Sequence, residues 1–488
     1  MFSRCLKPHL WRKSFSRSFG STIQLEDAER KFRDGNVDTV VVAYTDLYGR
    51  LLGKRYDAKD FVDNCAKAGA HSCTYTFAVD MDMNPLTGFA YASWETGFGD
   101  FHMVPDLSST TICAWNPGTA IVLCDARDTE TDELVPIAPR SILRKQLACL
   151  QDLAWNKGRP EEEQIGEIKA ASELEHYVLE DSFREAFEKD YTSLRRAGYY
   201  SEDYHILQGH RTEPLHRAVR RALRASGVPV ENSKGETGIG QHELNVQYDE
   251  VLRMADRHMI FKQCFKEIAM DQGKSVTFMA KPFGDDAGSS CHIHASLVNP
   301  RGSNIFQGDD RLEDINGCSE LFKHFLAGWI KHTPELFVLY SPTVNSYKRY
   351  LAGSWAPTAT AWGKDNRTAG FRIVGSGPSL RIECRLPGAD VNPYLAFAAA
   401  VASGIDGINN KLSPPPMLKG DGYSQATEAA SVPVSLGEAS RAFRDSSFVR
   451  ETFGPVVQEH YARFYHLEQQ AYDKAVTDWE RKRYFEMI

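Results

Sequence analysis

Three features are missing from this sequence of 488 residues, and each absence excludes a class of protein. No apolar run is as long as the ~18 residues that cross a bilayer, so we expect no membrane partner. The ten cysteines include no Cys-x-x-Cys pair. In a chain of this length they are typical of reduced thiols in an intracellular protein, not of a disulfide framework. An excess of basic charge is also missing, since the formal net charge is −8, which disfavours nucleic acid as a partner.

The composition that remains is that of a globular protein. Apolar residues make up 42% and charged residues 25% of the chain, which does not suit a disordered protein. The length exceeds what one hydrophobic core usually covers, so we expect at least two domains.

The first 24 residues differ from the rest of the chain. They carry five basic side chains, several serines and no acidic residue, with Phe and Leu at nearly helical spacing. This composition is typical of a mitochondrial transit peptide. Pro8 interrupts the helical pattern, and the alternative interpretation is a frayed basic N-terminus on a cytoplasmic protein. We therefore expect a mitochondrial or cytoplasmic location, with residues 1–24 as a candidate targeting segment.

The pattern of apolar and turn residues predicts an α+β protein of two parts. Residues 37–42 and 51–56 flank a turn and predict a β-hairpin, and short strands are expected at 112–115 and 120–125. Pro139 marks a boundary, after which Ser141 is expected to cap a helix. Further helices are expected near 213–226, 255–272 and 392–408. The prediction is thus a small β-rich domain over 36–136 followed by a larger α+β domain over 137–488.

The candidate site residues share a repeated spacing of two positions. In three stretches, polar residues alternate with apolar or small residues, as they do along a half-buried strand. The polar residues are Glu173 and Glu175, His292 and His294, and Arg381, Glu383 and Arg385. Side chains two apart on a strand face the same way, so each strand presents its polar groups to one surface. Glu236 and Glu243 add two carboxylates in the turn-rich run GETGIGQHEL.

Taken singly, each pair is also typical of the solvent face of an antiparallel strand. Together, three pairs that mix Glu, His and Arg favour a site. A cluster of glutamates needs neutralisation, which Mg²⁺ or Mn²⁺ supplies through hard oxygen ligands. Neighbouring arginines suit the phosphates of a nucleotide, so the pattern indicates a site for phosphoryl transfer. Zinc is disfavoured because no Cys-x-x-Cys accompanies the histidines.

Longer motifs show a resemblance to a family. GETGIGQHEL, FMAKPFGDDAGSSCHIHASL, SPTVNSYKR, NRTAGFRI and RIECRLPGADVNPYLAFAAAVASGIDGI follow one another in the order seen in type I glutamine synthetases and their γ-glutamyl-amine ligase relatives. PDLSSTTICAWNPGTAIVLCDARD resembles the small domain of the same family, so the resemblance runs from about 37 to 410. It implies a small N-terminal β-grasp domain and a glutamine synthetase-type catalytic domain, whose antiparallel sheet forms a funnel-shaped site. In the family, the β-grasp domain of the neighbouring subunit closes that site within a ring-shaped homo-oligomer.

The resemblance also implies roles for residues at matching positions. One metal ion would be held by Glu175, Glu236 and Glu243, and the second by Glu173, His292 and Glu383. ATP would be bound by Glu231, Tyr248, His294, Ser296, Arg367, Arg372 and Arg381, with the adenine against Tyr248. Glutamate would be held by Gly288, Arg349 and Arg385, and the catalytic residues would be Arg367, Arg349 and Glu383. The implied reaction uses ATP to convert the side-chain carboxylate of glutamate into γ-glutamyl phosphate, which an amine then attacks.

The sequence departs from the family at the amine site. Ammonia-using members have a glutamate where this chain has Trp355, and an aspartate where it has Ala78. The asparagine that usually precedes the site glycine is Ala287. Without those carboxylates a buried ammonium lacks compensating charge, whereas an indole suits the substituent of a larger amine. We therefore expect an organic amine, a polyamine or monoamine, in a pocket formed by Trp355 and Tyr199.

Three alternatives stay open. The chain could be a true glutamine synthetase that uses ammonia, if the position of Trp355 is matched wrongly. It could be a non-catalytic relative that binds nucleotide or metal, although all six metal ligands are present. A guanidino kinase shares the catalytic fold but not the long motifs.

Overall fold

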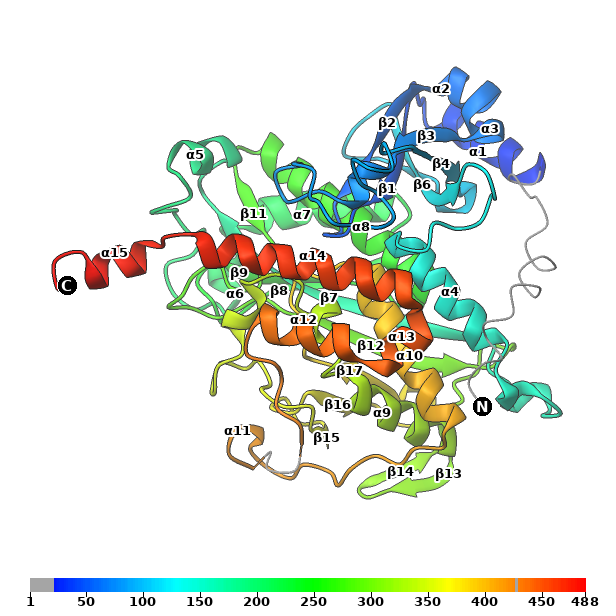
Figure 1. Ribbon diagram of the computed structural model, residues 1–488, viewed down its shortest axis with the longest axis vertical. Coiled ribbons are helices and arrows are strands. Elements are labelled where there is room, and N and C mark those ends of the chain that lie inside the picture. The colour runs from blue at the N-terminus through cyan, green and yellow to red at the C-terminus, as the bar shows by residue number, and fades with distance from the viewer. Residues whose placement is uncertain (1–21, 426–428) are drawn as a thin grey trace.

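A computed structural model describes residues 22–425 and 429–488 as two β-sheets with surrounding helices (Figure 1). The candidate targeting segment 1–24 lies almost entirely outside the described residues. The smaller sheet belongs to the N-terminal part of the chain and the larger sheet to the remainder.

The N-terminal sheet has six strands in the order β2-β1-β6-β4-β3, with β5 paired to β6. The strands are β1 (Thr39–Thr45), β2 (Leu51–Asp57), β3 (Ala70–Cys73), β4 (Asp100–Pro105), β5 (Thr111–Ile112) and β6 (Thr119–Asp128). The predicted hairpin is confirmed, because β1 and β2 pair antiparallel from Thr45↔Leu51 to Thr39↔Asp57. The strand expected at 112–115 ends at Ile112, since the chain turns over to Gly118 at a φ of 81°. Short helices α1 (Thr22–Asp34), α2 (Ala58–Asp60) and α3 (Ala66–Ala68) flank this sheet.

The larger sheet has nine strands, and its longest strand, β7 (Glu167–Leu179), is the one that the most neighbours join. The main order is β15-β16-β17-β12-β7-β9-β8, and β10 and β11 also pair with β7. The remaining strands are β8 (Val230–Gly235), β9 (Gln241–Val246), β10 (Asp249–Glu250), β11 (Ser275–Thr277), β12 (Cys291–Val298), β15 (Trp362–Lys364), β16 (Phe371–Val374) and β17 (Arg381–Cys384). The pairing is antiparallel except between the edge strands β15 and β16. A separate hairpin joins β13 (Gln307–Leu312) to β14 (Ile315–Cys318).

Twelve further helices follow along the described part of the chain, and all but the last lie against the body of the molecule. They are α4 (Pro139–Gln151), α5 (Phe183–Glu188), α6 (Ile206–Gly209), α7 (Glu213–Ala225), α8 (Val251–Asp271), α9 (Glu320–His332), α10 (Pro393–Asn409), α11 (Gly422–Gln425), α12 (Leu436–Asp445), α13 (Ser447–Phe453), α14 (Pro455–Lys474) and α15 (Asp478–Tyr484). The expected helices near 213, 255 and 392 are confirmed, and Asn392 caps α10 through a hydrogen bond from the Tyr394 N–H. The expected cap at Ser141 is wrong: α4 already begins at Pro139, and Ser141 is buried inside it.

Helix α10 forms the centre of the core and packs against α9, α4 and α8. Its approach to α9 is close enough to require glycine. A Cβ added at Gly328 of α9 would lie 2.2 Å from the Ser403 carbonyl oxygen, and one at Gly407 would lie 2.0 Å from the His324 carbonyl oxygen. The two backbones therefore touch, which fixes the helix pair behind the sheet.

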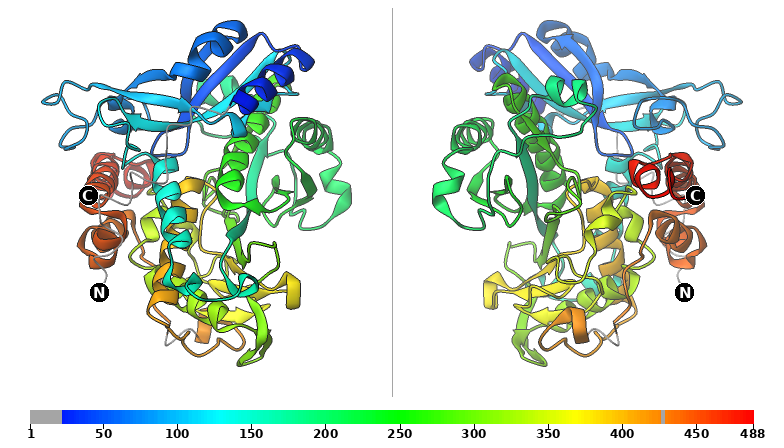
Figure 2. Two further views of the ribbon diagram at one scale, coloured as in Figure 1. Left: turned by 90° about the vertical axis from the view of Figure 1, so that its right-hand side faces the viewer. Right: turned by 90° about the vertical axis from the view of Figure 1, so that its left-hand side faces the viewer.

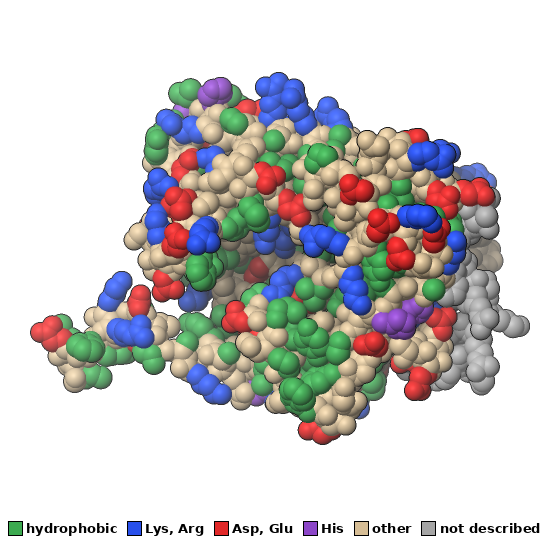
Figure 3. All heavy atoms as spheres, turned by 90° about the horizontal axis from the view of Figure 1, so that it is seen from above, with side chains coloured by type: hydrophobic (Ala, Val, Ile, Leu, Met, Phe, Trp, Pro, Cys, Tyr) green, Lys and Arg blue, Asp and Glu red, His purple; other side chains and the backbone are tan. Residues whose placement is uncertain are grey.

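Two side views show the N-terminal sheet at one end of the molecule, with α12 and α14 on one flank and α5 and α7 on the other (Figure 2). Seen from above, α15 stands away from the body (Figure 3), and its Trp479 and the following Phe485 are exposed. Among the helices that the structure describes, none combines the length and apolar character needed to cross a membrane.

Candidate active site

Strand register brings the predicted polar pairs together. His292 on β12 lies opposite Glu173 on β7, and Glu243 on β9 lies opposite Glu175. On the other side of β12, His294 is paired with Glu383 of β17. Residues opposite each other on neighbouring strands have adjacent side chains. Four strands thus contribute to one polar surface.

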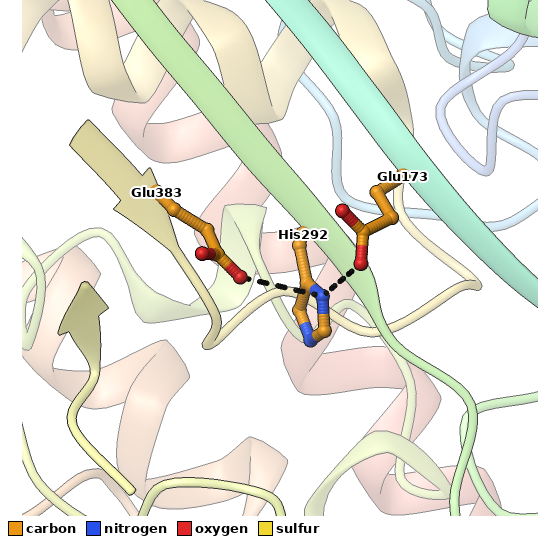
Figure 4. Close-up of side chains that lie close together, drawn as sticks. All are labelled: Glu173, His292 and Glu383. Atoms are coloured by element: carbon orange, nitrogen blue, oxygen red, sulfur yellow. Dashed lines mark hydrogen bonds and ion pairs between the residues drawn. The ribbon is translucent and has the colours of Figure 1, made fainter. Parts of the chain in front are cut away.

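The first ligand group consists of Glu173, His292 and Glu383, whose donor atoms lie within 4.8 Å of one another. Both carboxylates point at the imidazole between them (Figure 4), with His292 Nδ1 3.0 Å from Glu173 Oε1 and 3.6 Å from Glu383 Oε1. Burial opposes ionisation of Glu383, but His292, His294 and Arg385 hold its pKa at about 2. The pKa of Glu173 is likewise well below its usual value despite burial, because His292 and His294 hydrogen-bond to it.

The second ligand group consists of Glu175, Glu236 and Glu243, again with donor atoms within 4.8 Å of one another. Burial and the charge of Glu236 raise the pKa of Glu175 to about 7. Burial and the charges of Glu173 and Glu236 raise the pKa of Glu243 to about 10. Mutually repelling carboxylates with hard oxygen donors fit a divalent cation such as Mg²⁺ or Mn²⁺, which relieves this repulsion.

Hydrogen bonds from neighbouring side chains and the backbone orient the carboxylates of the second ligand group. Glu175 accepts from the Ser290 N–H at 2.8 Å and from the Ser290 hydroxyl at 2.6 Å. It also accepts from Gln241 Nε2 at 3.2 Å, and Asn245 donates to Glu243 Oε1 at 2.8 Å. Partners of this kind fix the direction in which ligating oxygens point.

Arginines surround the ligand groups. Arg372 Nη1 lies 2.9 Å from Glu383 Oε2, and Arg385 Nη1 lies 2.7 Å from Glu383 Oε1. Arg349 is buried and donates to the Leu386 carbonyl oxygen, while its Nε has no partner among the described residues. Arg367 is exposed at the cavity described below. A buried guanidinium with a free N–H is suited to hold a carboxylate.

Two adjoining cavities contain nearly all the predicted site residues. The first measures about 780 Å³, and its lining includes both ligand groups except Glu383, together with Gly288, Arg349, Trp355, Arg367, Arg372 and Arg385. The second measures about 700 Å³ and is lined by Glu231, Tyr248, His294, Ser296 and Arg381, among others. Glu173 and Asn245 belong to both linings.

The two residues predicted for the amine pocket differ in position. Trp355 lines the first cavity, is 58% exposed and has a left-handed backbone φ of 64°. Such a conformation is uncommon for a bulky residue, and strained conformations of this kind cluster at functional sites. Tyr199 lines neither of these two cavities, and its ring stacks on Arg211 with the guanidinium 4.3 Å from the ring centre. The role of Tyr199 in an amine pocket stays a prediction.

Several lining residues escaped the sequence-based prediction, and three of them are charged or aromatic. Asp203, Tyr204 and Lys234 lie in the first cavity. Lys234 precedes Glu236 by two residues, which is the spacing of the other polar pairs and could have indicated it. Asp203 and Tyr204 lie in an irregular segment without periodicity, so no pattern in the sequence indicates them.

The mixed sheet, the two carboxylate-rich ligand groups and the neighbouring arginines define a class of site, one whose residues could hold metal ions and phosphate groups. Residues 136–484 match the family model "Glutamine synthetase, catalytic domain". The chain belongs to the glutamine synthetase family.

Relatives and solved structures agree with this membership. The chain is 43% identical to the gamma-glutamylethanolamide synthetase of Streptomyces coelicolor, over 93% of this chain and 94% of the relative. It is 34% identical to the glutamate–isopropylamine ligase of a Pseudomonas species, over 93% and 96%. A solved GmaS/ADP complex superposes with a TM-score of 0.79 at 28% identity, over 94% of this chain and 99% of that one. The resemblance to the γ-glutamyl-amine ligase branch is confirmed.

Proposed function

We propose that this enzyme joins the γ-carboxylate of L-glutamate to an organic amine, with ATP as co-substrate and γ-glutamyl phosphate as the intermediate. It is a glutamine synthetase-type ligase, and two of its relatives are named for ligation of glutamate to an amine or for synthesis of a γ-glutamyl amide. The observation that carries the preference for an organic amine is Trp355, an indole in the wall of the first cavity where ammonia-using members of the family have a glutamate.

The proposed mechanism places the nucleotide in one cavity and glutamate in the other. The nucleotide would lie in the second cavity, with its adenine against Tyr248 and its ribose and phosphates near the polar residues Glu231, His294, Ser296 and Arg381. Glutamate would lie in the first cavity, held by Arg349 and Arg385 beside Gly288. Support comes from Glu173, which lines both cavities and so marks the border that a phosphoryl group has to cross.

Within that frame the side chains act mainly by positioning and by charge. Two divalent ions, Mg²⁺ or Mn²⁺, bound by the two ligand groups would offset the charge of the transferring phosphoryl group. Glu383 holds Arg372 and Arg385 in place, and Arg367 would stabilise the phosphoryl group as it moves to the glutamate carboxylate. The amine nitrogen then attacks the γ-carbonyl carbon, phosphate leaves, and the nitrogen loses a proton.

We also propose the finer architecture that the family implies. Residues 36–136 would form the β-grasp domain and 137–488 the catalytic domain, with sites closed by a neighbouring subunit in a ring-shaped homo-oligomer. The six-stranded N-terminal sheet supports the first proposal. The exposed apolar side chains of Tyr199, Ile206 and Leu207, in the segment that contributes Tyr204 to the first cavity, support the second.

The test of the proposed function is a comparison of kcat/KM for ammonium with kcat/KM for a panel of primary amines, at fixed ATP and glutamate. Release of ADP should depend on both glutamate and amine, which also separates an enzyme from a non-catalytic relative. We expect at least one organic amine to exceed ammonium by more than tenfold. Ammonium exceeding every amine would show an ordinary glutamine synthetase instead.

Replacing the indole should move the preference. Trp355→Glu restores a carboxylate to the cavity and should raise the ratio of kcat/KM for ammonium to that for the best amine by about tenfold, or about 1.4 kcal/mol. Trp479 is 61% exposed on α15 and serves as a control, because Trp479→Glu should leave the ratio unchanged. An unchanged ratio in Trp355→Glu would mean that the indole does not contact the amine.

A further inference from the structure

Lys234 is a lysine of the first cavity to which the proposed mechanism gives no role. It lies on β8, and its side chain is 23% exposed. Its Nζ pairs with Glu236 Oε1 and lies 3.5 Å from the Gly235 carbonyl oxygen. The same Nζ stands 4.2 Å from the centre of the Tyr204 ring. A carboxylate, a carbonyl oxygen and an aromatic face therefore surround one ammonium group.

These three groups are what a small cation needs when it leaves water. A carboxylate compensates its charge, a carbonyl oxygen accepts a hydrogen bond, and an aromatic face adds a cation–π contact. In this chain the position is occupied by an ammonium that is covalently tethered and cannot diffuse away. A free ammonium ion would have to displace it and leave the lysine without its partner, at the cost of a half-buried unpaired charge.

Pairing with Lys234 does not remove Glu236 from the second ligand group. A carboxylate has two oxygens, and Glu236 accepts from Lys234 through Oε1. The group needs only one oxygen from each of its three carboxylates. The lysine and a metal ion can therefore use Glu236 together.

An organic amine has a route to binding that ammonium lacks. Tyr204 is 61% exposed and Trp355 is 58% exposed, and both line the same cavity as Lys234. A substituent placed against these rings gains ~25 cal/mol for each Å² of apolar surface removed from water. Ammonium has no substituent and depends on the cation position alone.

We propose that Lys234 is a specificity-determining residue of the amine site, which excludes free ammonium by filling its cation position with the chain's own ammonium group. Organic amines then bind through their substituents against Tyr204 and Trp355. This inference rests on the proposed function, since it concerns which amine the same ligase accepts. The lysine's positive charge also opposes binding of a protonated amine nearby, so it favours entry of the neutral, nucleophilic form.

The experiment measures the ratio of kcat/KM for ammonium chloride to kcat/KM for isopropylamine in the full-length enzyme, at saturating ATP, glutamate and magnesium. Lys234→Met empties the cation position while keeping the length of the side chain, and should raise this ratio at least tenfold. Lys234→Arg keeps a tethered cation and should stay within about twofold of wild type. Lys274→Met is the matched control, because Lys274 is 21% exposed, pairs with Glu180 and lines neither of the two cavities.

A role in stability alone would lower both kcat/KM values together and leave their ratio unchanged, and that result would overturn the proposal. If Lys234→Met is too slow to assay, calorimetric titration with ammonium chloride against sodium chloride replaces the rates. Ammonium binding at least tenfold tighter than in wild type supports the inference, and equal binding overturns it. Wild-type enzyme that prefers ammonium would instead contradict the proposed function, so the two failures are distinct.

Discussion

At the residue scale, Glu383 links the first ligand group to the arginines. Its carboxylate is buried, lies 3.6 Å from His292 Nδ1, and pairs with both Arg372 and Arg385. Removing one partner of a buried charge pair leaves the other uncompensated, at a cost of about 3–5 kcal/mol. Glu383 therefore contributes both to the site and to the stability of the sheet around it.

We expect Glu383→Ala to abolish ATP-dependent turnover and to lower Tm, because it removes a proposed metal ligand and leaves Arg385 buried without its carboxylate partner. Glu383→Gln retains hydrogen bonding and should keep most of the stability while still losing turnover. Circular dichroism melting and phosphate release would separate the two effects. Glu180→Ala, which breaks the pair with Lys274 away from both cavities, is the control. Phosphate release near the wild-type rate in Glu383→Gln would show that the ligand assignment is wrong.

At the element scale, the start of α4 shows how a local signal can mislead. Serine is a common N-cap residue, so Ser141 just after Pro139 suggests that the helix begins behind it. Helix α4 instead starts at Pro139, because proline is well tolerated at the first helical position. The Ser141 hydroxyl is buried and has no hydrogen-bond partner among the described residues. Its polarity therefore costs stability where a cap would have contributed it.

The sign of the effect of Ser141→Ala distinguishes a cap from an unpaired hydroxyl. Loss of a true cap would destabilise the protein by about 1 kcal/mol. Removal of an unpaired buried hydroxyl should leave stability unchanged or raise it by about 1 kcal/mol. Reversible unfolding in urea measures the difference. A clear loss of stability would show that Ser141 has a partner that matters.

The stability contributed by the contact between α9 and α10 is expected to depend on pH. His332 at the end of α9 contacts Asp406 of α10 through Nε2 at 2.7 Å and Glu335 through Nδ1. Burial lowers the pKa of His332, but the hydrogen bonds to Asp406 and Glu335 outweigh it and raise the pKa above 6.5. The stability from this protonated ring is fully present below 6.5 and is lost as pH rises through the folded-state pKa.

We therefore expect Tm to fall as the pH rises above 6.5 in the wild type, and His332→Gln to flatten that part of the curve. His324 lies on the same helix and hydrogen-bonds the Leu412 carbonyl oxygen, not a carboxylate. The control variant His324→Gln should keep the wild-type slope. Parallel curves for wild type and His332→Gln would rule out this contribution.

At the scale of the whole molecule, the two cavities belong to the part of the chain that follows the N-terminal sheet. Both cavities are lined by residues from Lys169 onwards, and the described residues start at 22. Deleting residues 1–24 should keep kcat/KM within about twofold and, if they form a transit peptide, should move the protein out of mitochondria. Fractionation of cells expressing both forms tests this. Mature protein from cells that still begins at Met1 would exclude cleavage of a transit peptide.

Much of the candidate site could be predicted from the sequence, because short-range patterns determine which side chains share a face of a strand. Residues two apart on a strand share a face, so the alternation around Glu173, His292 and Glu383 predicts three polar surfaces, and the three together favour a site. The hairpin of β1 and β2 and the helix α10 also follow from turn and capping residues. Long motifs added the family, and their order along the chain made the match specific.

Only the tertiary structure decided how those surfaces meet. Strand order and register are set by packing between distant segments, so the pairing of His292 with Glu173 and of Glu175 with Glu243 is not written in either strand alone. The same holds for Tyr199, whose contact with Arg211 joins two segments that lie apart in the sequence. It holds too for Lys234, whose contact with Tyr204 joins a regular strand to an irregular segment. Local patterns determine which face a side chain takes, and long-range packing determines what it faces.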